Sequence, residues 1–90
     1  MDSNQIKELK RLIDKVVHAP TKKEARILIK ELEFMESNLQ NEIENPYLLG
    51  KLSEAINFAK EASGQSGEKQ HWISCMERTW YVFESRISSD

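Results

Sequence analysis

His71 and Cys75 are the two residues best suited to chemistry in this sequence. They lie four residues apart in a segment with helical hydrophobic spacing, so both side chains project from one face of a helix. Zinc takes three or four ligands, and only His18 and carboxylates remain to complete such a set. A cysteine nucleophile activated by histidine would also need an oxyanion hole and an orienting third group. We therefore expect neither a metal centre nor a catalytic pair here.

A second group of residues that could take part in chemistry is acidic. It comprises Glu31, Glu33, Glu36, Glu42 and Glu44. Carboxylate-bridged metal pairs inside helical bundles also use inward-pointing Glu-x-x-His motifs, and the sequence contains none. These glutamates fall mainly outside the apolar stripe, which is typical of a solvated helical face. The chain also lacks a glycine-rich phosphate loop and a nucleophile elbow. The sequence predicts no enzyme activity, no cofactor and no small-molecule substrate.

The elements that would position these residues are helices. Apolar residues recur at three-and-four spacing almost throughout, and no segment alternates as a half-buried strand does. Ser3 can cap a first helix, Thr21 and Glu24 form a capping box, and Asn45-Pro46 is typical of a helix start. We predict helices near residues 4–18, 22–44, 46–63 and 68–88. With short connections these form one all-α domain over residues 1–90, a four-helix up-and-down antiparallel bundle.

The core of that bundle is expected to hold large apolar residues from the last three helices. These are Leu28, Leu32, Leu52, Ile56, Met76, Trp80 and Phe83.

Composition limits the environment and the partners. Thirteen basic and 15 acidic residues give a net charge of −2, which excludes a uniformly basic nucleic-acid coat. No apolar run approaches the roughly 18–20 residues that span a bilayer, and the first residues lack a signal-peptide pattern. A single cysteine is typical of a reducing compartment. We expect a cytoplasmic protein that does not bind membranes.

Charge is unevenly distributed along the chain. Eight basic and three acidic residues give residues 7–30 a charge of +5, whereas one basic and six acidic residues give residues 31–54 a charge of −5. The basic segment leaves nucleic-acid binding as an alternative function, through Lys15, Lys22, Lys23 and Arg26. The helix that begins at Lys22 lacks the Asn, Gln or Ser at its start that would read bases, so nucleic acid is an unlikely partner.

Surplus apolar residues give the main functional hypothesis. Ile27 and Phe34 are seven residues apart and lie roughly 120–145° from the apolar stripe of the second helix. They either enlarge a two-sided core or form a partner surface, and Trp72 and Tyr81 are further candidates for partner binding. We predict a protein-interaction or regulatory module that forms a homodimer through this helical face. The basic segment before the face and the acidic segment after it favour antiparallel pairing.

In length and expected architecture the chain is similar to the small all-α bacteriocin immunity proteins. No sequence motif carries this likeness, which rests on size and fold class alone. It implies a second alternative, an inhibitor-type protein that binds a protein partner.

Overall fold

The computed structural model describes residues 2–64 and 67–89. Over these ranges the chain forms four helices and no strand, namely α1 (Ser3–Val17), α2 (Lys22–Gln40), α3 (Pro46–Gly64) and α4 (Lys69–Ser89). The expected all-α, four-helix class is therefore confirmed.

Capping side chains define where the helices begin. Asp2, rather than the predicted Ser3, caps α1: its carboxylate accepts from the backbone N–H of Gln5, and the Gln5 side chain accepts from the Asp2 N–H. Thr21 caps α2 as predicted, because its hydroxyl oxygen accepts from the Glu24 N–H at 3.2 Å, but the reciprocal bond of the predicted capping box, from the Thr21 N–H to the Glu24 carboxylate, is not formed within the described residues. Asn45 precedes Pro46 at the start of α3, and its side-chain oxygen accepts from the Tyr47 N–H at 2.9 Å.

The predicted end of the second helix is wrong by four residues. α2 ends at Gln40, and the chain turns through residues 41–45 before Pro46. The residue before a proline is disfavoured in helical conformation, and asparagine is a poor helix former, so the Asn41 and Asn45 region favours a turn. Ile43 is nevertheless buried, because its N–H donates to the Leu39 carbonyl and the turn folds its side chain onto the core.

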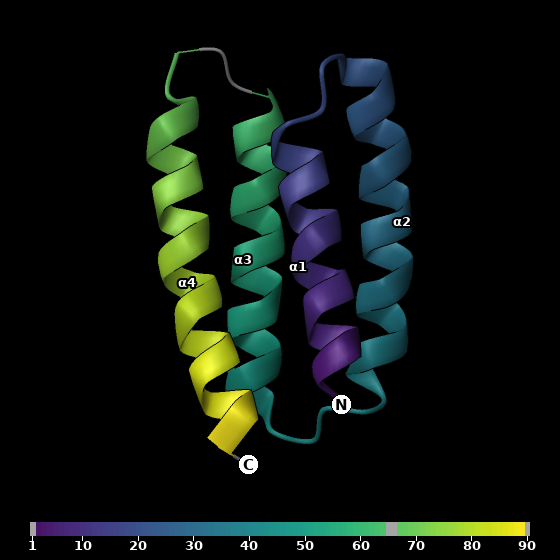
Figure 1. Ribbon diagram of the computed structural model, residues 1–90, viewed down its shortest axis with the longest axis vertical. Coiled ribbons are helices and arrows are strands. Elements are labelled where there is room, and N and C mark those ends of the chain that lie inside the picture. Colours follow the sequence, from purple (N-terminus) through teal and green to yellow (C-terminus); the bar gives the residue numbers. More distant parts are fainter. Residues whose placement is uncertain (1, 65–66, 90) are drawn as a thin grey trace.

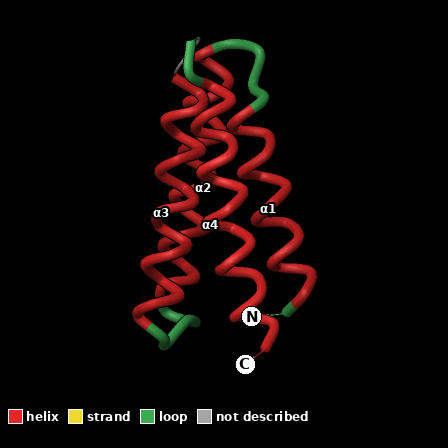
Figure 2. The backbone as a smooth tube through the Cα atoms, turned by 90° about the vertical axis from the view of Figure 1, so that its left-hand side faces the viewer, coloured by secondary structure: helices red, strands yellow, loops and turns green. Residues whose placement is uncertain are grey.

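The four helices run along one common direction, with the loops at the two ends of the molecule (Figure 2). The chain ascends α1, descends α2, ascends α3 and descends α4, so that consecutive helices are antiparallel (Figure 1). α1 and α3 contact each other in the middle of the bundle, whereas α2 and α4 lie at opposite edges. Within the described residues α2 therefore packs only against α1 and α3, which leaves its outer face open.

The core is continuous through all four helices. α3 packs most closely against α4, because the small residues Ala55, Ala59 and Ala62 admit the large side chains of its neighbour. The predicted core residues Leu32, Leu52, Ile56, Met76, Trp80 and Phe83 are all buried. Leu28 is an exception, since it is only partly buried and packs against the margin of the core.

Candidate interaction surface

The outer face of α2 exposes two large apolar side chains. Ile27 is 55% exposed and Phe34 is 70% exposed. Because they are seven residues apart, they lie two turns from each other along one line of the helix. Neither belongs to the core, whose contribution from α2 is centred on Leu32 and Leu39. We call the surface formed by Ile27 and Phe34 with their exposed neighbours the α2 outer face.

A shallow hollow adjoins Phe34 where α2 meets α1. It has a volume of about 420 Å³ and is lined by Leu12, Lys30, Glu31, Phe34 and Met35. Leu12 and Met35 are partly buried and continue the apolar surface of Phe34 toward α1. Phe34, but not Ile27, thus borders a mostly apolar groove that leads toward α1.

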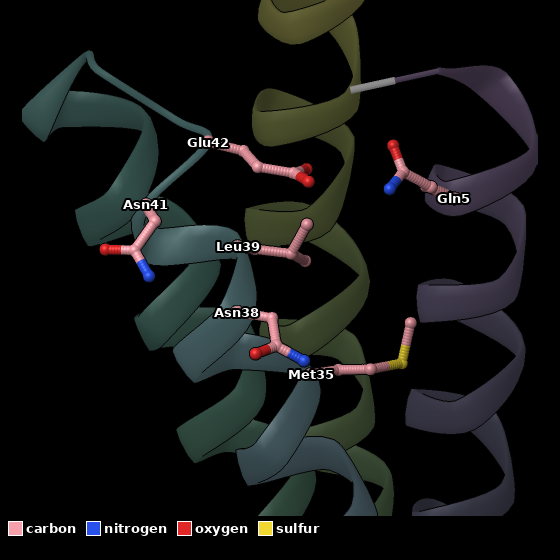
Figure 3. A pocket seen from close by; sticks show the side chains of 6 residues that line it. All are labelled: Gln5, Met35, Asn38, Leu39, Asn41 and Glu42. Carbon is pink, nitrogen blue, oxygen red and sulfur yellow. The ribbon is translucent and has the colours of Figure 1, made fainter.

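A second hollow lies nearer the start of α1, with a volume of about 480 Å³ (Figure 3). Met35 and Leu39 line it from α2, together with Asn38 and Asn41, while Gln5 and Glu42 point toward each other across it from opposite sides. Its lining contains neutral amides and one carboxylate, and the Gln5 side chain already takes part in the cap of α1. Such a lining offers hydrogen-bond donors and acceptors and the one negative charge of Glu42.

Charged residues of α2 divide between two environments. On the side toward α3, Glu33 forms an ion pair with Lys60 at 3.6 Å, and the Ser53 hydroxyl donates to Glu36 at 2.9 Å. Around the outer face lie Lys23, Glu24, Lys30 and Glu31, all exposed. None of these four side chains forms an ion pair within residues 2–64 and 67–89.

The predicted partner-binding residues do not form one surface. Trp72 and Tyr81 lie on α4, at the edge of the bundle opposite α2. Tyr81 is 71% exposed, whereas Trp72 is partly buried and stacks on Phe58 of α3 with 6.0 Å between ring centroids. Trp72 therefore joins α4 to α3, and only Ile27 and Phe34 share a face.

The candidate nucleic-acid residues are also separated. Lys15 lies beside Glu8 and Glu31 in the groove between α1 and α2. Lys22 and Arg26 instead line a hollow of about 230 Å³ between α2 and the end of α3. The basic side chains thus point toward different sides of the bundle, and the groove that holds Lys15 also holds carboxylates.

His71 and Cys75 both lie on α4. His71 is exposed, Cys75 is partly buried, and the Nε2 and Sγ atoms are 3.8 Å apart. His18 is distant from both in the chain, at the end of α1. Within the described residues no three histidine, cysteine, aspartate or glutamate side chains come together as metal ligands.

Sequence reasoning missed one exposed aromatic residue, Tyr47 in the first turn of α3. Its ring is 46% exposed and lies between two cations, with Lys51 Nζ at 5.6 Å and the Arg86 guanidinium carbon at 5.0 Å from its centroid. Lys51 follows Tyr47 by one helical turn, and that spacing was the only available signal, because Arg86 comes from another helix.

These observations define a small all-α bundle with one exposed apolar helix face. Comparison with models of protein families, with curated proteins and with solved structures finds no match. In the described part of the chain, no helix combines the length and the hydropathy needed to cross a membrane.

Proposed function

We propose that this protein is a non-catalytic protein-interaction module that self-associates through the α2 outer face. The observation that carries the proposal is the exposure of Ile27 and Phe34 on one line of a regular helix. The two side chains are about 10 Å apart along the helix axis and face the same direction, so a single partner helix can contact both. The groove formed by Leu12 and Met35 extends the apolar strip toward α1.

The free energies involved predict a weak dimer. Burying one large apolar side chain contributes about 1.5–3 kcal/mol, so the two pairs of a symmetric dimer contribute about 6–12 kcal/mol. Association costs about 4–15 kcal/mol in lost translational and rotational freedom. The two ranges overlap, so no large net gain is expected, and the association must be measured up to high protein concentration.

The experiment is sedimentation equilibrium of the wild-type protein between about 10 µM and 1 mM, compared with the double variant Ile27→Glu, Phe34→Glu. The expected result is a concentration-dependent increase in mass for the wild type and a monomer for the variant. Gln40→Glu is the matched control, because it adds a carboxylate to an exposed position of α2 that faces away from Ile27 and Phe34. Circular dichroism establishes that each variant remains helical.

A wild-type protein that stays monomeric at 1 mM contradicts the proposal. So does a dimer that persists in the double variant, because association would then use another surface. A monomeric protein that binds a different chain through α2 would instead correspond to the inhibitor-type alternative.

The non-catalytic part of the proposal rests on the position of His71 and Cys75. His71 lies in the first turn of α4 and Cys75 one turn further along, and within the described residues no third histidine, cysteine, aspartate or glutamate gathers with them as a ligand set. Nucleic-acid binding has less support than self-association, because Lys15 points away from Lys22 and Arg26.

A further inference from the structure

The charges around the α2 outer face are sorted into two edges. At about 100° per residue, Lys23 and Lys30 lie roughly 30–50° to one side of the line through Ile27 and Phe34. Glu24 and Glu31 lie roughly 50–70° to its other side. Glu31 lines two hollows toward α1, beside Leu12 and Met35, and Lys30 lines one of them together with Phe34. The apolar strip thus runs between a basic edge and an acidic edge.

We infer that the partner of this surface is a second copy of the chain whose α2 lies parallel to the first and in register. In this arrangement Lys23 and Lys30 of each copy face Glu24 and Glu31 of the other. The inference rests on the proposed self-association and adds to it the orientation of the two copies and the residues that select it.

Symmetry explains why sorted edges favour the parallel pair. When two facing helices are related by a two-fold axis along their length, the left edge of one meets the right edge of the other. A basic edge then meets an acidic edge on both sides of the strip. When the axis is perpendicular to the helices, each edge meets its own copy, and Lys30 faces Lys30 while Glu31 faces Glu31.

The same four side chains are available for such pairing. Each is exposed, and within the described residues none has an ion-pair partner in its own chain. Glu33, by contrast, lies on the side of α2 toward α3 and is paired to Lys60 of that helix. The outward-facing charges can therefore form contacts with a partner and favour one orientation of it.

The antiparallel pairing expected from the sequence was based on the net charges of whole segments. Much of the positive charge of residues 7–30 comes from α1 and from side chains directed away from the α2 outer face. On the α2 outer face itself, between Lys23 and Glu31, the sign of the charge changes from one edge of the helix to the other. Along each edge the sign stays the same. The placement of the side chains therefore favours the parallel orientation.

Cysteine cross-linking measures the orientation directly. In a Cys75→Ser background, Asn38→Cys places a thiol on the line through Ile27 and Phe34, one turn beyond Phe34 and close to the end of α2. In the parallel dimer this residue faces its own copy and forms a disulfide under mild oxidation. In an antiparallel dimer centred between Ile27 and Phe34, the two copies of this residue are roughly 20 Å apart and form none. Gln40→Cys is the control, because it points away from the face.

Charge reversal gives an independent readout. Lys30→Glu, and separately Glu31→Lys, should each weaken the dimer about tenfold, because each introduces two like-charge contacts. The compensated variant Lys30→Glu, Glu31→Lys restores two opposite-charge contacts and should return the dissociation constant to within about threefold of wild type. An antiparallel dimer has like charges at both positions before and after each change, so none of the three variants would alter it.

The outcomes separate the two proposals. A dimer that requires Ile27 and Phe34 but neither cross-links through Asn38→Cys nor responds to charge reversal overturns the parallel orientation alone. A wild-type monomer overturns self-association and the orientation with it. Cross-linking at position 38 but not at position 40, together with recovery in the compensated variant, supports both.

Discussion

The Lys10 ammonium group on α1 lies 3.0 Å from a Glu77 carboxylate oxygen on α4. This ion pair joins the two helices whose mutual contact is the least extensive among those that touch in the described part of the chain. Lys10 also contacts Asp14 one turn further along α1, at 2.9 Å. Lys10 therefore interacts with a carboxylate on its own helix, that of Asp14, and with a carboxylate on α4, that of Glu77.

This bridge predicts a pH-dependent stability. Burial by itself lowers the pKa of Lys10, but its hydrogen bonds and charge interactions with Asp14 and Glu77 outweigh that effect and raise the pKa above the ordinary value of 10.5. A pKa raised in the folded state contributes stability that is fully present below pH 10.5 and is lost as the pH rises through the folded-state value.

Glu77→Gln should remove part of this contribution. Because Lys10 and Glu77 are partly exposed, we expect a loss of about 0.2–1 kcal/mol at neutral pH, smaller at high salt. The difference in urea midpoint between wild type and variant should be smaller at pH 11 than at pH 7, because the contribution of Lys10 is lost above pH 10.5. A difference that stays constant over this range would mean that the ion pair does not contribute to stability.

A second prediction compares a buried and an exposed position on α2. Leu32 is fully buried, so Leu32→Ala should lower the free energy of unfolding by about 2–5 kcal/mol. Ile27→Ala removes an apolar side chain of similar size from the α2 outer face and should change it by no more than about 0.5 kcal/mol. Urea denaturation at low micromolar concentration, where association is negligible, provides the comparison. Equal losses would place Ile27 in the core.

The contrast between Leu32 and Ile27 also shows what the sequence could predict. Spacing on the helical wheel placed Leu32 in the core and Ile27 off the apolar stripe, but it left open whether Ile27 is core or surface, and it put the partly buried Leu28 in the core. The same periodicity extended α2 too far, because Ile43 continues the apolar pattern although a turn, rather than the helix, buries it. Periodicity indicates which way a side chain faces within one helix. It does not reveal a turn of the chain that keeps the same apolar spacing.

The candidate site was likewise predictable only where local spacing within one helix determines it. Ile27 and Phe34 were identified because their spacing alone places them on one line. Tyr47 was missed and the contact of Trp72 with α3 was not foreseen, because their surroundings come from other helices, Arg86 for Tyr47 and Phe58 for Trp72. Which helix covers a side chain depends on the arrangement of the bundle, and no local spacing encodes it.

The two tryptophans of α4 give a third prediction. The Trp80 indole N–H donates to Glu84 at 3.2 Å, whereas the buried Trp72 indole N–H has no partner within the described residues. An unpaired buried donor is destabilising, so its removal offsets part of the packing that a smaller ring loses. Trp72→Phe should therefore cost at least about 1 kcal/mol less than Trp80→Phe in urea denaturation. The reverse order would indicate that the Trp72 donor has a partner in solution.

The cap of α2 gives a fourth prediction. The Thr21 hydroxyl accepts the Glu24 N–H, which would otherwise be unsatisfied at the helix start. Thr21→Ala should destabilise the protein by about 1 kcal/mol, whereas Thr21→Ser keeps the acceptor and should cost much less. Thermal unfolding distinguishes them, and similar losses for both would assign the effect to the threonine methyl group instead.

The final prediction concerns how stability depends on protein concentration. If folded chains associate through Ile27 and Phe34, mass action stabilises the folded state, and each tenfold increase in concentration above the dissociation constant adds about 1.4 kcal/mol per dimer. The melting temperature of the wild type should then rise between 10 µM and 1 mM. Ile27→Glu, Phe34→Glu should melt at a concentration-independent temperature close to that of the dilute wild type, because both side chains lie outside the core. A large drop in melting temperature for this variant even at 10 µM would mean that the α2 outer face stabilises the monomer itself, which would remove the basis for an interaction surface.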